Sequence, residues 1–328
     1  MPVSAARLLI PGALALLTAL LTLTGCQETG RNGQVLDTPT SGAIQVAVDE
    51  TFRPIIESHV DTFQKLYTNA TVRAIYGSEA AVSQRFMASD SVRAVILARR
   101  LTAAEEAEFV RLKLVPATTR IAVDAVAIIL HPSNPDSLLH LSQLEEMLNG
   151  KLTNWAQLNP ASKLGEVNVV FDNSGSSTTR FLRDSVLRGT PLTARASATK
   201  SVPALIDYVA THPGAVGVLG VGWISDGDDQ QVKGFQRRIK VAGLTAKHGA
   251  VAAGEYYKPY QAYIALRQYP LCRELFIITR EARNGLGLGF ASFVAGDKGQ
   301  RIFLKAGLVP GLPVRREVQF APGGPPPQ

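Results

Sequence analysis

The stretch Ile121-Ala122-Val123-Asp124-Ala125-Val126-Ala127-Ile128-Ile129-Leu130 is an apolar run that ends at His131-Pro132. It is too long for an ordinary strand of about five or six residues, so we expect it to pass from one lobe of the protein into another. A matching return is expected within residues 262–278, where Tyr269-Pro270 interrupts a strand-like sequence. Two such crossings predict a first lobe built from both ends of the chain, with a second lobe inserted in it.

Short apolar strands alternate with helical patterns on the N-terminal side of this run. The pattern predicts strands over residues 44–48, 72–76 and 94–97 and helices over residues 52–67, 80–87 and 103–112. Thr102 and Glu105 have the spacing of a capping box at the start of the last helix. This alternation predicts an α/β fold in which each lobe is a mostly parallel sheet flanked by helices.

The N-terminal segment has the features of a secretory signal. Residues 8–23 are apolar, follow Arg7 and end in Leu23-Thr24-Gly25-Cys26, which resembles a bacterial lipobox. An uncleaved membrane anchor is the alternative, but spanning a bilayer usually takes roughly 20 apolar residues. We therefore expect a lipoprotein signal peptide, lipidation of Cys26, and a protein anchored to a membrane of the cell envelope on its periplasmic or extracytoplasmic side.

The remaining segments complete a predicted domain organisation. Residues 27–41 are polar and lack apolar periodicity, and the end of the chain is rich in Pro and Gly. The predicted parts are a signal peptide (1–25), a flexible tether (26–41), lobe I (42–122 plus 272–318), lobe II (123–271) and a disordered tail (319–328).

Composition and charge argue against a nucleic-acid-binding function. The chain has 328 residues, 46% of them hydrophobic, and a formal net charge of +7. Its basic residues are scattered, and no aromatic residues interleave them as a nucleic-acid platform would require. A positive surface favours anionic ligands through long-range attraction.

The segment Asp172-Asn173-Ser174-Gly175-Ser176-Ser177-Thr178-Thr179-Arg180 follows an apolar run and precedes a helix-like stretch. A strand that runs through small hydroxyl residues into a helix leaves backbone N–H groups free at the helix start, where the helix dipole favours an anion. A serine hydrolase is the alternative, but the segment lacks the Gly-x-Ser-x-Gly pattern of a nucleophile elbow. The histidines also lack the spacing of a zinc site. We therefore expect a binding protein and not an enzyme.

Three more segments carry recognisable motifs. Residues 141–155 read Leu-Ser-Gln-Leu-Glu-Glu-Met-Leu-Asn-Gly-Lys-Leu-Thr-Asn-Trp, in which Gly150 ends a helix ahead of Trp155. Residues 212–217 read His-Pro-Gly-Ala-Val-Gly, and residues 299–310 read Gly-Gln-Arg-Ile-Phe-Leu-Lys-Ala-Gly-Leu-Val-Pro. In this order, across residues 42–310, they resemble the phosphate-binding substrate-binding proteins of bacterial ABC transporters, the PstS-like group of type II periplasmic binding proteins.

The resemblance implies an anion site made of backbone and hydroxyl donors from three places, without metal ions or cofactors. The matching ligand-binding residues are Thr51, Phe52, Ser78, Ser174, Gly175 and Ser176, with Glu50 and Gly77 as further candidates. The neutral donors of such a site lie near helix N-termini.

Two departures from the family bear on specificity. Ala98 stands where the family's phosphate binders place an aspartate that accepts the proton of hydrogen phosphate, so Glu79 and Asp172 are candidates to replace it or are plain helix caps or surface charges. The arginine often found upstream of the Ser-Gly segment is also missing. Arg180 lies about one helical turn after Ser176 and is the first candidate for the counter-charge, with Arg99 the second and solvent-facing residues as the alternative.

The resemblance therefore implies a lipid-anchored protein that captures an inorganic oxyanion, most simply phosphate, in an interlobe cleft and delivers it to the permease of an ABC transporter. Sulfate or molybdate are alternative ligands, and a sensor or scaffold with the same fold is an alternative role. No nucleic-acid partner is expected.

Overall fold

The structure is a computed structural model that describes residues 36–173, 175–247, 252–281 and 283–314. The predicted signal peptide, Cys26, the tail over residues 319–328 and Ser174 lie outside the described residues. Within the described ranges, no helix combines the length and the apolar character needed to cross a membrane.

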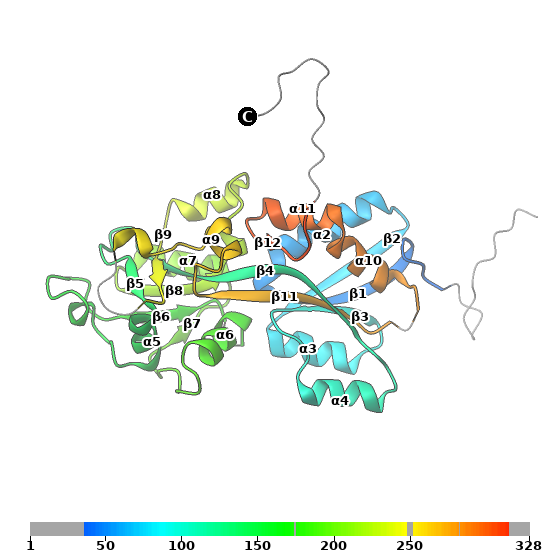
Figure 1. Ribbon diagram of the computed structural model, residues 1–328, viewed down its shortest axis with the longest axis horizontal. Coiled ribbons are helices and arrows are strands. Elements are labelled where there is room, and N and C mark those ends of the chain that lie inside the picture. The colour runs from blue at the N-terminus through cyan, green and yellow to red at the C-terminus, as the bar shows by residue number, and fades with distance from the viewer. Residues whose placement is uncertain (1–35, 174, 248–251, 282, 315–328) are drawn as a thin grey trace, which may run out of the picture. The chain divides into compact units, whose positions relative to one another are not determined.

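One long strand, β4 (Ala117–Leu130), runs through both halves of the described chain (Figure 1). Lobe I, as we define it, contains β1 (Gly42–Asp49), η2 (Glu50–Phe52), α2 (Arg53–Leu66), β2 (Ala70–Gly77), α3 (Glu79–Ala88), β3 (Val92–Leu97), α4 (Ala103–Arg111), β11 (Cys272–Thr279), α10 (Leu286–Ala295), α11 (Asp297–Lys305) and β12 (Val309–Pro310). Lobe II contains β5 (Leu138–His140), α5 (Leu141–Asn149), η3 (Trp155–Gln157), β6 (Asn168–Phe171), α6 (Ser177–Ser185), β7 (Ser197–Ala198), α7 (Val202–Thr211), β8 (Ala215–Gly220), η4 (Val221–Trp223), α8 (Gln230–Gln236), β9 (Lys240–Val241), β10 (Gly243–Thr245), η5 (Ala253–Glu255) and α9 (Gln261–Ala265).

The central strands form a continuous sheet in the order β2-β1-β3-β11-β4-β8-β6-β7. The first part of β4 pairs with β11, and its second part pairs with β8, so β4 joins the two parts of this sheet. The prediction of mostly parallel sheets holds only in part. The pairs β1–β2, β1–β3, β6–β7 and β6–β8 are parallel, whereas β4 and β11 pair with their neighbours in antiparallel fashion.

The antiparallel pairing follows from the connection between the lobes. The chain leaves lobe I along β4 and re-enters it along β11, so these two strands run in opposite directions side by side. Their register places Arg273 directly opposite Asp124. The lobe boundaries predicted after residues 122 and 271 stay a prediction, because β4 belongs to both halves of the sheet.

Local sequence signals account for several of these elements. Thr102 and Glu105 form the predicted capping box of α4. Gly150 ends α5 with a left-handed φ of 81°, a conformation that glycine adopts without steric cost. Trp155 is fully buried and donates through Nε1 to the Gly214 carbonyl, 3.0 Å away. This bond ties two of the sequence motifs of lobe II together.

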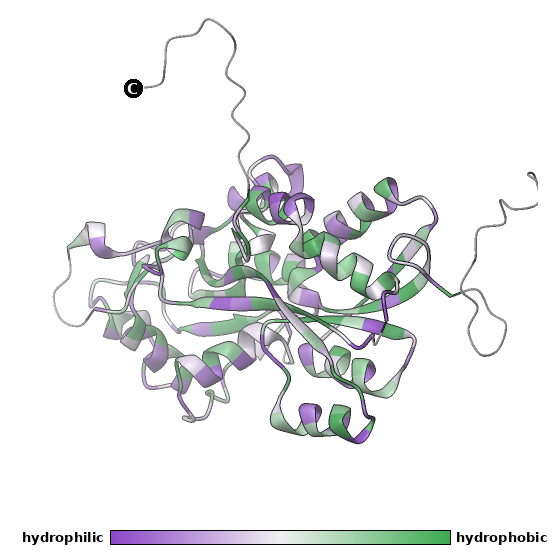
Figure 2. Cartoon of the chain, turned by 45° about the vertical axis from the view of Figure 1, so that its right-hand side comes forward, coloured by the Kyte–Doolittle hydropathy of each residue, from purple (hydrophilic) through white to green (hydrophobic). Residues whose placement is uncertain are grey.

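Apolar strands form the core between two layers of helices. Figure 2 shows the central strands mostly green, whereas the covering helices carry purple stretches. β8 and the second part of β4 are buried on both faces. Their sequences therefore do not alternate between apolar and polar residues, as a strand with one face in solvent would. The core thereby fixes the ends of the strands, from which the candidate site is built.

Candidate functional site

The predicted anion-binding segments each follow the carboxyl end of a parallel strand. Thr51 and Phe52 lie in η2 after β1, Ser78 precedes α3 after β2, and Ser176 precedes α6 after β6. Loops at this end of parallel strands are the usual place for ligands in open α/β sheets. The fold therefore turns three separate sequence segments toward one region.

Ser78 and Ser176 are the N-cap residues of their helices. Ser78 Oγ accepts from the Ala81 N–H at 3.4 Å, and Ser176 Oγ accepts from the Thr179 N–H at 3.3 Å. The Ser176 hydroxyl also lies 2.6 Å from Thr178 Oγ1. Two helix N-termini, each with its partial positive charge, thus start at this region from different lobes.

The two lobes touch each other at these segments. Thr51 Oγ1 lies 3.4 Å from Ser177 Oγ, and the Trp223 Nε1–H donates to the Thr51 carbonyl at 2.9 Å. A Cβ atom added to Gly175 would lie 3.2 Å from Ser78 Cβ. The structure therefore brings together Thr51, Ser78, Gly175 and the start of α6.

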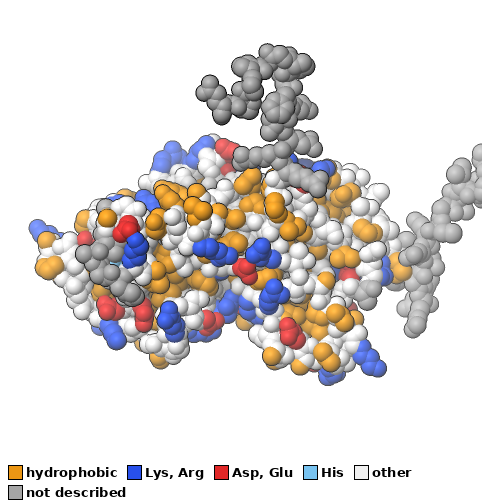
Figure 3. All heavy atoms as spheres, in the orientation of Figure 1, with side chains coloured by type: hydrophobic (Ala, Val, Ile, Leu, Met, Phe, Trp, Pro, Cys, Tyr) orange, Lys and Arg blue, Asp and Glu red, His pale blue; other side chains and the backbone are white. Residues whose placement is uncertain are grey.

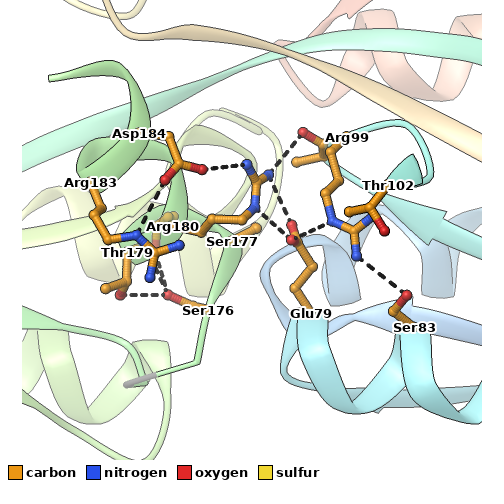
Figure 4. A network of polar contacts seen from close by, with 12 residues as sticks. Glu79, Ser83, Arg99, Thr102, Ser176, Ser177, Thr179, Arg180, Arg183 and Asp184 are labelled. Atoms are coloured by element: carbon orange, nitrogen blue, oxygen red, sulfur yellow. Dashed lines mark hydrogen bonds and ion pairs between the residues drawn. The ribbon is translucent and has the colours of Figure 1, made fainter. Parts of the chain in front are cut away.

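An ion-pair network joins the lobes beside this contact (Figure 4). Arg180 Nε and Nη2 donate to the two carboxylate oxygens of Glu79 at 2.6 and 3.0 Å, and Nη2 also donates to the Ala98 carbonyl at 3.2 Å. Arg99 Nε donates to Glu79 at 3.0 Å, and its other nitrogens reach Glu105. We call the Arg180–Glu79 contact the interlobe ion pair.

In this network both predicted counter-charges, Arg180 and Arg99, are already paired with a carboxylate. Arg180 contacts the Ala98 carbonyl at the position where the family's aspartate is missing, but its guanidinium is engaged by Glu79. Arg99 is engaged by two carboxylates. Glu79 is only 4% exposed and accepts from both arginines, so its carboxylate already takes part in ion pairs, and its role as a proton acceptor for a ligand stays a prediction. Basic side chains gather near the middle of the face in Figure 3.

Two buried carboxyl groups lie at the ends of β1 and β6. Asp49 Oδ1 accepts from the Thr51 N–H at 3.1 Å, and Asp172 Oδ1 accepts from the Thr178 hydroxyl at 3.0 Å. Among the described residues, the second oxygen of each has no hydrogen-bond partner. Burial raises the pKa of Asp49 to about 6, against the lowering effects of the Ser177 hydroxyl and the Arg273 charge. Burial likewise raises the pKa of Asp172.

A third buried charge pair lies on the crossing strands. Arg273 Nε donates to Asp124 Oδ2 at 2.8 Å, and both side chains are almost completely buried. Arg273 Nη1 donates to Ser177 Oγ at 3.0 Å, at the first turn of α6. Its guanidinium carbon lies 5.0 Å from the centre of the Phe52 ring. Sequence reasoning identified neither member of this pair.

A signal for the pair was present in the sequence. Asp124 is the lone charge within the apolar run over residues 121–130. A charge within a fully buried strand needs a partner, because an isolated buried charge costs several kcal/mol. That partner is distant in sequence, so only the pairing of β4 with β11 identifies it as Arg273.

The remaining candidates differ in their environment. Glu50 pairs with Arg53 of α2 through both carboxylate oxygens and is partly exposed. Gly77 ends β2 next to Ser78, and Phe52 contributes its buried ring beside Arg273. Ser174 lies outside the described residues. Roles for these residues in ligand binding stay predictions.

Comparisons with known proteins identify the family and the fold of the chain. A family model described as a PBP superfamily domain matches residues 34–298, which is most of the chain. The chain is similar to the phosphate-binding protein PstS of Staphylococcus epidermidis, with 25% identity over 186 residues. The match covers 55% of this chain and 52% of that protein, so the chain spans about half the length of this relative.

Two solved structures share the fold at lower sequence identity. A protein from Clostridium perfringens, assigned as a phosphate ABC transporter substrate-binding protein and solved with bound phosphate, has a TM-score of 0.67 and 18% identity, covering 82% of this chain and 99% of that one. An ABC-type phosphate transport receptor from Vibrio cholerae has a TM-score of 0.61 and 17% identity, covering 82% of this chain and 100% of that one. The mixed α/β fold is that of type II periplasmic binding proteins, and the chain belongs to the PBP superfamily.

Proposed function

We propose that this protein binds a phosphate-like oxyanion between its lobes and delivers it to an ABC transporter. The observation that carries the proposal is the meeting of two helix N-termini from different lobes. Ser78 at the start of α3 lies against Gly175 before α6, and Thr51 lies against Ser177. Helix N-termini with small hydroxyl residues bind anions without a full counter-charge. The similarity to a PstS protein supports phosphate as the first ligand to test.

Asp172 supports a preference for a protonated oxyanion. Its Oδ2 atom is buried and lacks a hydrogen-bond partner among the described residues, and its other oxygen is oriented by Thr178. A carboxylate oxygen only accepts hydrogen bonds, so it favours a ligand with an O–H group and repels one without. Asp172 thus takes over the acceptor role that Ala98 cannot provide. Hydrogen phosphate and hydrogen arsenate fit this requirement, whereas sulfate and molybdate do not.

Isothermal titration calorimetry with phosphate, arsenate, sulfate and molybdate tests the ligand class. The purified protein is freed of phosphate and titrated with each anion across pH. We expect phosphate and arsenate to compete for one site, and sulfate and molybdate to bind at least about ten-fold more weakly. A preference for sulfate would overturn the phosphate assignment. Failure of every oxyanion to bind would overturn the proposed function itself.

Asp172→Asn separates the acceptor role from general binding. The amide can donate a hydrogen bond, so the variant should lose most of its preference for phosphate over sulfate. Asp184→Asn is the matched control, because Asp184 is an exposed aspartate on α6. Unchanged selectivity in the Asp172 variant would show that another group rejects sulfate.

The Ser176 hydroxyl supports a binding role rather than hydrolysis. It caps α6 and contacts the hydroxyls of Thr178 and Thr179, and no histidine among the described residues hydrogen-bonds to it. Phosphate esters and carboxyl esters should therefore not be turned over. Turnover that Ser176→Ala abolishes would favour a serine hydrolase.

Delivery to a transporter is tested in cells. Removing the protein should reduce uptake of labelled phosphate, and the wild-type gene should restore it. Retained binding in vitro with unchanged uptake would favour a sensor or scaffold.

We also propose that Cys26 anchors the protein through a lipid. The support is the Leu23-Thr24-Gly25-Cys26 motif after a basic and apolar leader. The protein should fractionate with membranes, and Cys26→Ser should abolish lipid labelling. Equal labelling of both forms would contradict the anchor.

A further inference from the structure

Arg273 reaches the candidate anion site from β11, which lies outside the sequence motifs described above. It lies near the start of β11, directly opposite Asp124 of β4, and its Nε–H donates to Asp124 Oδ2 at 2.8 Å. β4 and β11 are the strands along which the chain passes between lobes. The guanidinium is therefore held at the junction of the lobes, whereas Arg180 is carried on a lobe II helix.

One outer nitrogen of the guanidinium lies at the start of α6, and the other lies near Gly220 at the end of β8. Nη1 donates to Ser177 Oγ at 3.0 Å. Nη2 is buried and, within the part of the chain that the structure describes, has no hydrogen-bond partner. It lies close to Gly220, because a Cβ atom added there would be 3.3 Å from Nη2 and 2.5 Å from Thr51 Cγ2. Glycine thus allows Arg273 and Thr51 to approach the same place.

A buried donor without a partner is costly, so its presence needs a reason. Leaving such a group unpaired in the protein interior is unfavourable, and more so when the group is charged. Buried ion pairs also rarely stabilise a fold more than packed apolar side chains of the same size. A ligand that accepts from Nη2 would recover this cost when it binds.

The other two candidate cations are less able to neutralise a ligand. Arg180 pairs with Glu79 and the Ala98 carbonyl, and Arg99 pairs with Glu79 and Glu105. Arg273 shares its charge with Asp124 but keeps one donor nitrogen without a hydrogen-bond partner among the described residues.

We propose that Arg273 supplies the counter-charge of the bound oxyanion, donating from Nη2 while Nε and Nη1 hold the guanidinium on Asp124 and Ser177. This inference rests on the proposed function and names the residue that replaces the arginine missing upstream of the Ser-Gly segment. Because both anchoring strands lie at the junction of the lobes, Arg273 is pre-organised before the lobes close, which reduces the ordering cost of binding.

Paired substitutions test this role. Removing Arg273 alone would leave Asp124 as an uncompensated buried charge, so the test variant combines Arg273→Gln with Asp124→Asn. Asp124→Asn alone keeps the guanidinium and serves as the reference. Arg120→Gln is the matched control, because Arg120 pairs with Glu274 across the same two strands at an exposed position and carries the same charge.

Phosphate affinity is measured by calorimetry, and folding is followed by thermal unfolding. We expect the double variant to bind phosphate roughly ten- to a hundred-fold more weakly than the wild type. Arg120→Gln should bind nearly as well as the wild type, and Asp124→Asn, which keeps the guanidinium but weakens its anchor, should lose clearly less affinity than the double variant. A folded double variant with wild-type affinity would overturn the inference, as would an equal loss in Asp124→Asn alone.

If the double variant does not fold, Arg273→Lys tests the same counter-charge role. Lysine keeps the charge opposite Asp124, but its ammonium is a single point and cannot span the separate positions of Asp124, Ser177 and an anion as the planar guanidinium fork does. We expect about ten-fold weaker binding at nearly unchanged thermal stability. Wild-type affinity in this variant would overturn the inference. A wild-type protein that binds no oxyanion would instead overturn the proposed function, so the two failures are distinct.

Discussion

At the scale of single residues, the candidate site concentrates buried polar groups whose hydrogen-bonding capacity is not used up. Asp49, Asp124 and Asp172 each keep an oxygen without a partner among the described residues, and Arg273 keeps a nitrogen. Buried polar atoms in native proteins are nearly always paired, so such a cluster favours a ligand site over a purely structural role. These groups are also expected to make stability depend on pH.

Asp49→Asn should change the pH dependence of stability. Burial raises the pKa of Asp49 from 3.8 to about 6, so between these values the folded state binds its proton and the unfolded state does not. The stabilisation that Asp49 contributes is therefore greatest below about pH 4. It decreases by on the order of 3 kcal/mol as the pH rises toward 6. Urea unfolding should show that the variant gains stability relative to wild type across this window.

Asp61→Asn is the control for this measurement, because Asp61 is an exposed aspartate of α2. The difference in the free energy of unfolding between Asp61→Asn and the wild type should stay nearly constant between about pH 4 and pH 6. A constant difference for Asp49→Asn as well would contradict the raised pKa.

At the scale of elements, helix ends and helix packing set the positions of the binding groups. Phe52 and Pro54 lie where η2 passes into α2, and Ser78 and Ser176 cap α3 and α6. Behind the site, His59 of α2 is fully buried and contacts the carbonyls of Ile55 and Gly299, at 2.7 and 3.0 Å. It thereby joins α2 to the start of α11.

His59 should make this helix packing sensitive to acid. Burial lowers its pKa from 6.5 to about 4, so the unfolded state takes up a proton first as pH falls. The stabilisation that neutral His59 contributes is therefore fully present above pH 6.5. It decreases by on the order of 3 kcal/mol as the pH falls toward 4. His59→Gln should be less stable than the wild type at neutral pH, and the difference should shrink on acidification.

Urea unfolding of both proteins between about pH 7 and pH 4 measures this change. His131→Gln is the control, because His131 is only half-buried, in the loop between β4 and β5. A stability difference that does not vary with pH would contradict a buried neutral imidazole.

At the scale of the whole molecule, the contacts between lobes determine how readily the site opens. The interlobe ion pair of Arg180 with Glu79 lies beside the contacts of Thr51 with Ser177. Glu79 is buried, so its bidentate contact is screened less than a surface ion pair. The ion pair therefore favours contact between the lobes before any ligand contributes to it.

Glu79→Gln should shift the ligand-free protein toward an open form. The amide cannot form the bidentate ion pair, so the closed form should lose about 1.5–3 kcal/mol. Small-angle X-ray scattering without ligand should give a larger radius of gyration than for the wild type, and saturating phosphate should reduce it. Phosphate affinity should fall, because a smaller fraction of the protein is ready to bind.

Asp184→Asn is the control for this variant, because Asp184 contacts the same Arg180 within α6 and not across the lobes. It should leave the radius of gyration and the affinity unchanged. A Glu79 variant with the scattering of the wild type would show that other contacts hold the lobes together.

The sequence by itself determined the alternation of strands and helices, the long apolar strand that includes residues 121–130, the caps at Thr102 and Gly150, and the PBP-like family. These depend on periodicity and short-range hydrogen bonds, which neighbouring residues specify. Only the tertiary structure decided that Arg180 pairs with Glu79 and that Arg273 lies at the start of α6. Such pairings join residues far apart in the chain, and their electrostatic energy depends on distances and burial that only the folded sheet sets.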